Sequence, residues 1–231
     1  MTTILLTGST RGIGAACFDV LTGAGATVLG HGTRSGIAAD LADPAAPQRL
    51  WAEALEQAGG RIDVLVNNAG VFEDNPLDRD HEAWVAGWER TMRINLTASA
   101  ELSRLAVLHW HDNGGGRLVN VASRAAYRGD SPAHWHYAAS KAGMVAMTKT
   151  IARAYAREGV LAFAVCPGFT MTGMADDYLA SRGGDKLLAD IPLGRVADPA
   201  EVAGVVRFLA LDAPASMTGA VLDVNGASYV R

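Results

Sequence analysis

The feature that most constrains the fold of this chain is a glycine-rich turn close to its beginning. Residues 3–6 are apolar and flanked like a short buried strand, and residues 15–21 carry apolar side chains at helical spacing. Between these two segments stand Gly8, Gly12 and Gly14. A helix that begins on such a turn offers unpaired backbone N–H groups and the positive end of its dipole to a phosphate. The turn therefore favours a nucleotide site, although a tight turn without a ligand would use the same residues.

Length and composition fit a single domain that spans residues 1–231. Hydrophobic residues make up 49% of the chain and charged residues 19%, which is ordinary for a globular protein. The formal net charge is -4 and the basic residues are scattered, so we expect no nucleic-acid partner. No apolar run approaches the about 18 residues of a membrane span, and no secretion signal precedes the first strand. We expect no membrane attachment and a cytoplasmic location.

The end of the second expected strand, residues 27–29, bears on the choice of dinucleotide. In a dinucleotide-binding fold, an acidic side chain at this point accepts the ribose 2′-OH and repels a 2′-phosphate. This chain has Thr33 there, with Arg34 beside it and Arg11 in the glycine turn. Two guanidinium groups can bind a 2′-phosphate through charge-assisted hydrogen bonds, although arginines are also common on solvated surfaces. We therefore favour NADP, with NAD as the alternative.

The segment after this strand is unusually short. Between Arg34 and Asp40 there are too few residues for a helix and a parallel crossover, which takes about a dozen or more. A third strand near residues 37–39 is therefore expected to be stunted, differently paired or absent. A helix over residues 44–58 follows, with Leu50 on its apolar face.

The rest of the chain alternates between strands and helices. The expected strands cover residues 62–66, 117–122, 160–165 and 220–224, and the expected helices cover residues 82–111, 136–157 and 198–211. Residues 170–190 are mixed in character and contain two adjacent glycines, so we expect a mobile substrate flap there. We find no repeat or linker that would divide the chain.

Asparagines stand at two places in the expected fold where they can have either a structural or a functional role. Asn67 and Asn68 follow the strand over residues 62–66, at an end where open α/β sheets bind ligands. They would line a cofactor channel, brace the sheet or belong to a plain loop. Asn95 lies inside an expected helix, where its propensity is mediocre. It either bonds locally or faces water, or it bends the helix and presents a carbonyl or a water to an active site.

Three other residues can carry proton chemistry. Tyr137 and Lys141 are four residues apart on an expected helix, so their side chains share a face. A free phenol has a pKa near ~10 and exchanges protons poorly at neutral pH, and a neighbouring ammonium would lower that pKa. We expect Tyr137 to act as a general acid toward a carbonyl oxygen or as a general base toward an alcohol. Ser123, at the end of a strand, could hydrogen-bond the same oxygen.

Together these motifs resemble the short-chain dehydrogenase/reductase family over essentially the whole chain. The matching motifs are Thr7-Gly8-x-x-x-Gly12-Ile13-Gly14, Asn67-Asn68-Ala69-Gly70, Asn95, Ser123, Tyr137-x-x-x-Lys141 and Pro167-Gly168. The resemblance implies a single-domain, Rossmann-type, doubly wound parallel α/β sheet of six or seven strands with helices on both faces. The end of the chain, through Asn225-Gly226, is similar to that of 3-oxoacyl-(acyl-carrier-protein) reductases. Members of that branch are often tetramers, so the resemblance implies a homotetramer or a homodimer.

The resemblance also implies roles for individual residues. Tyr137 would exchange the proton and Ser123 would orient the substrate oxygen. Lys141 would bind the nicotinamide ribose and tune Tyr137, while Asn95 would hold a water of a proton relay. The residues expected to bind the cofactor are Gly8, Ser9, Thr10, Arg11, Gly12, Ile13, Gly14, Thr33, Arg34, Asp40, Leu41, Asn68, Ala69, Gly70, Tyr137, Lys141, Pro167, Gly168, Thr170 and Thr172. Among them, Asp40 and Leu41 match the adenine-contacting position, and Thr170 and Thr172 match positions near the nicotinamide carboxamide.

The expected activity is NADP-dependent hydride transfer between a small ketone or aldehyde and its alcohol. An NAD-linked catabolic alcohol or sugar dehydrogenase is one alternative. A non-catalytic dinucleotide-binding protein, such as a sensor or scaffold, is the other, and the complete set of four polar residues argues against it.

The substrate itself is not specified by the sequence. The expected pocket edge is largely apolar and consists of Phe72, Tyr127, Trp135, Phe169, Met171 and Met174. Such a wall suits aromatic or acyl ketones, although core packing uses the same residue types. Arg124 could reach an anionic substrate group, but we expect it to face solvent because arginine is rarely buried unpaired. His134 and His136 lack a third ligand at suitable spacing, so we expect no metal.

Overall fold

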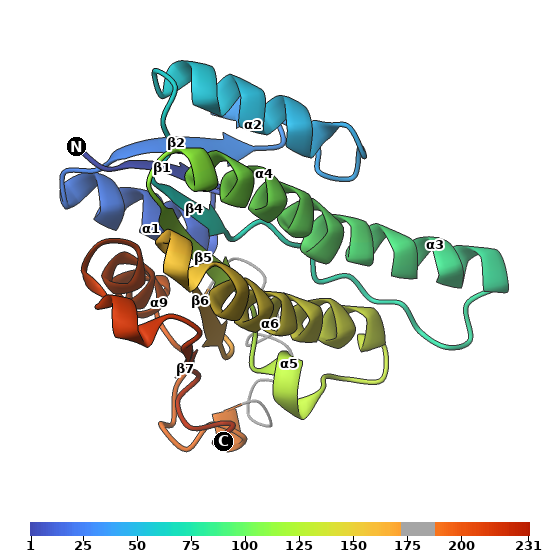
Figure 1. Ribbon diagram of the computed structural model, residues 1–231. Coiled ribbons are helices and arrows are strands. Elements are labelled where there is room, and N and C mark those ends of the chain that lie inside the picture. Colours follow the sequence, from blue (N-terminus) through green and yellow to red (C-terminus); the bar gives the residue numbers. More distant parts are fainter. Residues whose placement is uncertain (172–187) are drawn as a thin grey trace.

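The computed structural model describes residues 1–171 and 188–231, and these form a parallel sheet of seven strands. The strand order is β3-β2-β1-β4-β5-β6-β7 (Figure 1). The strands are β1 (Thr3–Leu6), β2 (Thr27–Gly32), β3 (Ile37–Ala38), β4 (Val64–Asn67), β5 (Gly116–Val121), β6 (Val160–Pro167) and β7 (Val221–Val224). All neighbouring strands pair in parallel. The expected doubly wound parallel sheet is therefore confirmed.

Helices cover both faces of this sheet. Figure 1 shows α1 (Gly12–Gly23) and α9 (Pro199–Arg207) on one face, with α2 (Ala46–Gln57), α4 (Ala98–Asp112) and α6 (Trp135–Tyr155) on the other. The remaining described helices are α3 (His81–Met92), α5 (Ala125–Arg128), the π-helices η1 (Arg93–Thr97) and η3 (Phe208–Asp212), and the short 3₁₀ turns η2 (Ala156–Glu158) and η4 (Ala215–Met217). Successive strand residues point to opposite faces and feed two cores. Leu5 packs in one core, whereas Ile4 and Leu6 pack in the other.

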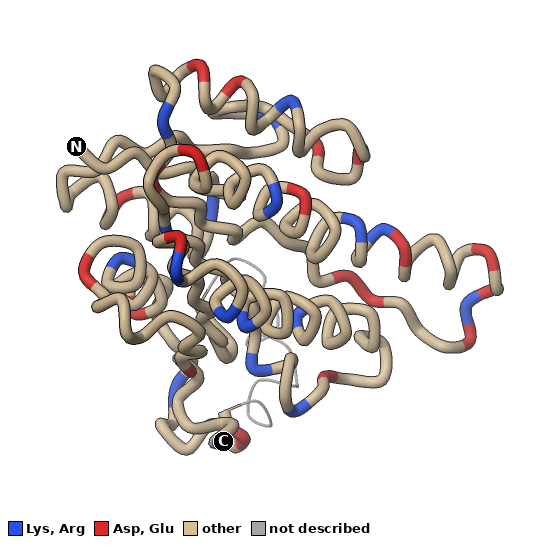
Figure 2. Tube along the Cα trace, in the orientation of Figure 1, with Lys and Arg blue, Asp and Glu red and all other residues tan. Residues whose placement is uncertain are grey.

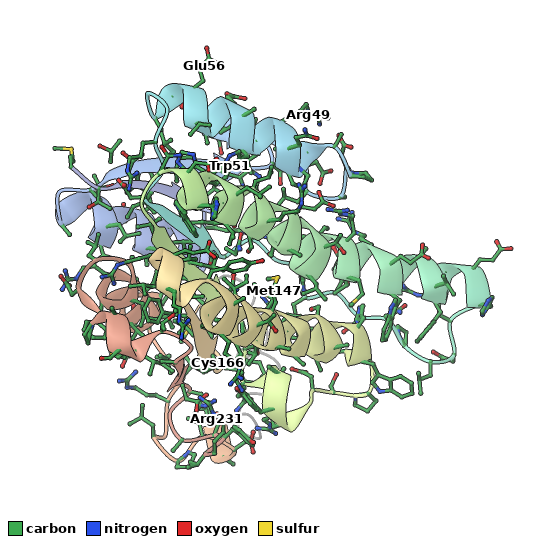
Figure 3. All side chains as sticks on the ribbon, viewed as in Figure 1. Arg49, Trp51, Glu56, Met147, Cys166 and Arg231 are labelled. Carbon is green, nitrogen blue, oxygen red and sulfur yellow. The ribbon has the colours of Figure 1, made fainter. Side chains whose placement is uncertain are left out.

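Helix α2 illustrates how hydrophobic periodicity sets this packing. Leu50, Trp51 and Ala54 are buried against the sheet, while Arg49 and Glu56 are exposed. Figure 3 shows Glu56 directed away from the molecule and Trp51 lying on the inner side of the helix. The apolar stripe at helical spacing is what holds the helix on the sheet.

The segment after β2 is stunted, as expected. Strand β3 has two residues and pairs in parallel with β2 through His31–Ile37 and Gly32–Ala38. Only residues 33–36 join the two strands. This tight connection needs glycine at Gly36, where φ is +66° and a Cβ would collide with the carbonyl oxygen of Gly30. The β3 edge of the sheet is therefore short and closely folded.

The chain reverses the direction in which strands are added between β1 and β4, which lie side by side at the centre of the sheet. Ligands of open α/β sheets bind at such a switch point, beyond the carboxyl ends of the strands. The loops that follow β1, β4, β5 and β6 all leave the sheet at this edge, since the strands are parallel. The fold thus gathers the glycine turn and the other predicted motifs along one edge.

Charge is distributed without a dominant patch. Figure 2 shows basic and acidic residues intermixed along the described chain. None of the described helices is both long enough and apolar enough to cross a membrane. Most of the expected flap over residues 170–190, including Thr172 and Met174, lies outside the described residues.

Candidate active site

The glycine turn has the geometry of an anion site. Gly8 and Gly12 adopt left-handed backbone conformations, with φ of +67° and +53°. A Cβ on Gly14 would collide with the carbonyl oxygen of Gly8. Helix α1 begins at Gly12 without a side-chain cap from Arg11 and without an acidic residue in its first turn. Its first N–H groups are therefore left for an anion, so this turn fits the pyrophosphate of a dinucleotide.

Hydrogen bonds between the segments that follow β1 and β4 brace this turn. The hydroxyl of Thr7 accepts hydrogen bonds of 3.0 Å from the backbone N–H groups of Asn68 and Ala69. The side-chain amide of Asn68 donates to the carbonyls of Thr7 and Gly8, at 3.1 and 3.0 Å. Asn67 acts in the core, where its amide donates to Asn120 at 2.9 Å. Both asparagines therefore brace the sheet, which was one of the expected alternatives.

The structure adds His31, which sequence reasoning missed. Its Nδ1 accepts a hydrogen bond of 3.2 Å from the N–H of Gly8, and its Nε2 donates to the carbonyl of Ala39 at 2.9 Å. Ser9 also binds the His31 carbonyl, through its N–H at 2.8 Å. The ring is 3% exposed, and burial lowers the pKa of His31 from its ordinary value. A neutral imidazole thus joins the glycine turn to the short β2–β3 edge. The sequence signal that could have identified His31 is a histidine at the buried end of an expected strand.

The expected 2′-phosphate corner is open to solvent. Thr10, Arg11, Thr33 and Arg34 are exposed, and neither arginine forms an ion pair within the described ranges. Nearby, Asp40 caps a local turn by accepting from Ala42, and Leu41 is buried in the core. Ile13, at the start of α1, packs against the other core. The guanidinium groups are free to meet an anion, and the adenine contact stays a prediction.

The predicted proton-transfer residues lie together above the end of β5. Tyr137 and Lys141 share one face of α6, with the Lys141 amine 5.8 Å from the centroid of the Tyr137 ring. Ser123 follows β5 and forms a hydrogen bond with the Tyr137 phenol. The Ser123 oxygen also accepts from the N–H of Ala125 at 3.1 Å, which holds the side chain in place. A substrate oxygen that meets Tyr137 would therefore also meet Ser123.

Lys141 is deeply buried and well anchored. It is 4% exposed, and its amine donates to the carbonyl of Val121 at 2.9 Å. Burial lowers the pKa of Lys141 to about 8. The amine is therefore mostly charged at neutral pH, but it can lose its proton under mildly alkaline conditions.

Burial works against the expected lowering of the Tyr137 pKa by Lys141. It raises the pKa of Tyr137 to about 12, and the hydrogen bond from Ser123 opposes that rise only in part. The Lys141 amine points to Val121 and lies 5.8 Å from the ring centroid, so its tuning of Tyr137 stays a prediction. With its pKa raised to about 12, Tyr137 is protonated at neutral pH.

Asn95 occupies a widened helical turn. It lies in the π-helix η1 between α3 and α4, a turn that is widened by an inserted residue, and its burial excludes the alternative that it faces water. Its side chain accepts from the N–H of Val71 at 2.8 Å and donates to the Val71 carbonyl at 3.0 Å. It also donates to Ser140 at 3.3 Å. These bonds tie the loop after β4 to α6, and the water-holding role of Asn95 stays a prediction.

Gly70 lies where these groups meet. A Cβ on Gly70 would stand 3.2 Å from the Asn95 side-chain oxygen and 3.5 Å from the Lys141 amine. Beyond it, Phe72 presents its ring edge-on to Tyr137, with centroids 4.8 Å apart, and stacks on His134 at 3.8 Å. One aromatic wall of the site is thus built from the loop after β4.

The end of β6 supplies another wall. Gly168 packs so closely on Asn225 that a Cβ would lie 2.9 Å from the Asn225 Cα, and Thr170 donates to the Gly168 carbonyl at 3.2 Å. Pro167 accepts a hydrogen bond of 2.9 Å from the N–H of Arg124, which extends the β5–β6 pairing past the strands. Pro167 therefore lies beside the segment that follows β5, and the expected roles of Pro167, Gly168 and Thr170 in cofactor binding stay predictions.

Several pocket residues differ from expectation. Arg124 is 7% exposed, so the expectation that it faces solvent is wrong. Its guanidinium carbon lies 4.8 Å from the Phe169 ring centroid, and its Nη1 lies 3.5 Å from Asp190. Stacking and the long ion pair stabilise the buried charge in part. Trp135 is 53% exposed, and the Tyr127 hydroxyl is engaged by Arg231 at 2.8 Å.

Known proteins are similar in sequence to this chain. The family model described as enoyl-(acyl carrier protein) reductase matches residues 8–227. The chain is 35% identical to the 3-oxoacyl-(acyl-carrier-protein) reductase FabG of Vibrio cholerae, over 98% of this chain and 96% of that protein. It is 33% identical to the reductase of the same name from Escherichia coli K12, over the same shares.

A solved structure supports the same grouping. A candidate gluconate dehydrogenase from Agrobacterium tumefaciens matches with a TM-score of 0.90 and 27% identity, over 100% of this chain and 97% of that one. The family match, the curated relatives and this structural neighbour all extend over nearly the whole chain. The chain belongs to the short-chain dehydrogenase/reductase family of oxidoreductases.

Proposed function

We propose that the chain reduces a ketone or aldehyde to the corresponding alcohol with NADPH. One observation carries the proposal: a protonated tyrosine hydrogen-bonded to Ser123, with a buried amine on the same helix face. A proton donor, an oxygen-positioning hydroxyl and a cation are what carbonyl reduction requires.

The residues of the glycine turn fit the cofactor. The N–H groups at the start of α1 would hold the pyrophosphate, and Arg11 and Arg34 would hold the 2′-phosphate. When bound, the dinucleotide supplies a hydride to the carbonyl carbon. The absence of an acidic side chain at Thr33 removes the repulsion that would disfavour a 2′-phosphate.

Tyr137 would supply the proton. As the carbonyl carbon gains a hydride, the carbonyl oxygen gains negative charge and takes the proton from the Tyr137 hydroxyl, which yields the alcohol. Ser123 would hydrogen-bond the same oxygen and fix its position. The Lys141 ammonium would stabilise the phenolate left on Tyr137, at the stage where a negative charge exists beside it.

Tyr137 carries the proton that the proposed reduction consumes. With the pKa of Tyr137 raised to about 12, the phenol carries its proton at neutral pH, as a general acid must. Oxidation of an alcohol would need the phenolate. The likeness to the reductases named FabG agrees with this direction.

A second candidate is an NAD-linked dehydrogenase of an alcohol or sugar derivative. Its support is the likeness to the candidate gluconate dehydrogenase. A dinucleotide-binding protein without turnover is disfavoured, because it would not need Ser123 beside Tyr137 and a buried Lys141.

The proposal is tested with a panel of carbonyl compounds and alcohols, monitored by NADPH and NADH absorbance. We expect NADPH consumption with at least one carbonyl compound and a higher kcat/KM with NADPH than with NADH. Alcohol oxidation with NAD as the faster reaction would favour the second candidate. Tight dinucleotide binding without turnover of any substrate would contradict both.

A further inference from the structure

The residue directly after Ser123 is a buried arginine. Arg124 begins beside the reacting group, and the hydrogen bond from its N–H to Pro167 at 2.9 Å keeps its backbone against the end of β6. From there its side chain extends over Phe169, with 4.8 Å between the guanidinium carbon and the ring centroid. A cation therefore stands over Phe169, on a residue that directly follows Ser123.

This cation is only partly neutralised. Asp190 lies 3.5 Å from Arg124 but 2.5 Å from Arg128, so its carboxylate is chiefly the partner of Arg128. Among the described residues, two guanidinium groups thus share one carboxylate within ion-pair distance. Asp130 acts on Arg124 only through space, at longer range. With respect to this described part of the chain, Arg124 retains donors for a second anion, and its 7% exposure means that water screens the charge weakly.

The local chemistry indicates which anion fits. The guanidinium edge already faces a carboxylate, and its planar donors match the two oxygens of that group. Stacking on Phe169 restricts the guanidinium group of Arg124. Less side-chain entropy is therefore lost when this group binds an anion. A side chain with only a structural role at position 124 could be held by stacking on Phe169 alone. It would not need a positive charge.

We propose that Arg124 binds a carboxylate of the substrate, so that the enzyme acts on small oxo acids and the hydroxy acids formed from them. This inference rests on the proposed carbonyl reduction and names its substrate class. Ser123 and Tyr137 would hold the carbonyl oxygen while Arg124 holds the carboxylate of the same molecule. Neutral ketones and thioesters would lack the second anchor.

Matched acids and methyl esters test the inference. Pyruvate, acetoacetate and 4-oxopentanoate place the carboxylate at increasing distances from the ketone, and each has a neutral methyl ester. We expect wild-type kcat/KM to favour one acid over its ester by about 30-fold, the effect of one charge-assisted contact. The preference should lie mainly in KM, since the contact acts on bound substrate.

Variants then assign the preference to Arg124. Arg124→Gln should reduce the acid-to-ester ratio by about tenfold or more, and Arg124→Lys should restore part of it. Arg49→Gln is the matched control, because Arg49 is an exposed arginine on α2 that does not contact Asp190; it should change the ratio less than about threefold. Thermal midpoints of all variants establish that the folds are retained.

The outcomes separate the inference from the proposed function. If esters are reduced as fast as acids, or if Arg124→Gln lowers kcat equally for both, the carboxylate site is wrong and carbonyl reduction stands. Preference for hydroxyacetone phosphate, or for a 3-oxobutyryl thioester of N-acetylcysteamine, would overturn the carboxylate assignment in the same way. If no acid, ester, phosphate or thioester is reduced, the proposed function fails first.

Discussion

The two ends of the proposed cofactor site are built in opposite ways. At the catalytic end, Lys141 is buried, and Ser123 and Asn95 are each held by hydrogen bonds. At the adenosine end, the loop before the two-residue strand β3 carries exposed residues, among them Arg34, and His31 is the buried link. At the catalytic end, burial shifts the pKa values of the reacting groups. At the adenosine end, exposed charges are expected to adjust the affinity for the cofactor. Substitutions at the two ends should therefore fail in different ways.

The largest effect is expected for Tyr137→Phe. Without the phenol, the substrate oxygen has no proton donor, and kcat should fall about 10³-fold or more. Cofactor affinity should change less than about threefold, because the glycine turn is untouched. Initial rates and NADPH fluorescence titrations measure the two quantities. An active variant would refute the role of Tyr137.

Lys141→Met should lower kcat by about 100-fold or more, because the phenolate would form without a nearby cation. Its stability should respond differently from its activity. The folded protein loses the Lys141 proton at about pH 8, whereas the unfolded chain holds it to about 10.5. The unfolded state therefore binds more protons between these values, and wild-type stability rises with pH across this window.

The Lys141→Met variant lacks this rise in stability with pH. Its free energy of unfolding, relative to wild type, should fall by about 3 kcal/mol between pH 8 and pH 10.5. Urea unfolding of both proteins across this range measures the difference. A constant difference would mean that the buried amine keeps an ordinary pKa.

Arg34→Ala tests the adenosine end. It should lower kcat/KM with NADPH by about tenfold, the effect of one exposed phosphate contact, and leave kcat/KM with NADH nearly unchanged. Arg49→Ala is a matched control, because Arg49 is an exposed arginine on α2. Equal losses with both cofactors would place Arg34 outside the 2′-phosphate site.

The smallest effect concerns His31. Burial holds its pKa below the ordinary 6.5, so the neutral ring is fully favoured above that value and is lost as the pH falls through the folded pKa. A protonated Nδ1 would face the Gly8 N–H donor and disturb the turn. Wild-type NADPH affinity should fall about threefold between pH 7 and pH 5, while His31→Gln should respond less. Parallel titration curves would remove His31 from the cofactor site.

The sequence was most informative where function depends on local pattern. The glycine turn, the alternation of strands and helices, and the four-residue spacing of Tyr137 and Lys141 predicted the sheet and the grouping of polar residues. The short segment before Asp40 correctly predicted a stunted β3. These features follow from spacing and periodicity along the chain.

What sequence could not supply depends on burial and on distant partners. The raised pKa of Tyr137 reflects its burial, which the four-residue spacing to Lys141 does not reveal. Arg124 was expected in solvent because its partners, Phe169 and Asp190, lie far along the chain. His31 showed no motif, since its bond to Gly8 exists only once β1 and β2 are paired.

The π-helical turn at Asn95 has a consequence for how this protein tolerates changes in length. One extra residue in a helix shifts everything before it by about 100° around the axis. Deleting a single residue within Arg93–Thr97 would restore an ordinary helical turn without a break, yet α3 would be swung to a different side of α4. Natural or engineered deletions should therefore be accepted at the exposed start of α3 and rejected inside this turn, even though both leave a continuous helix.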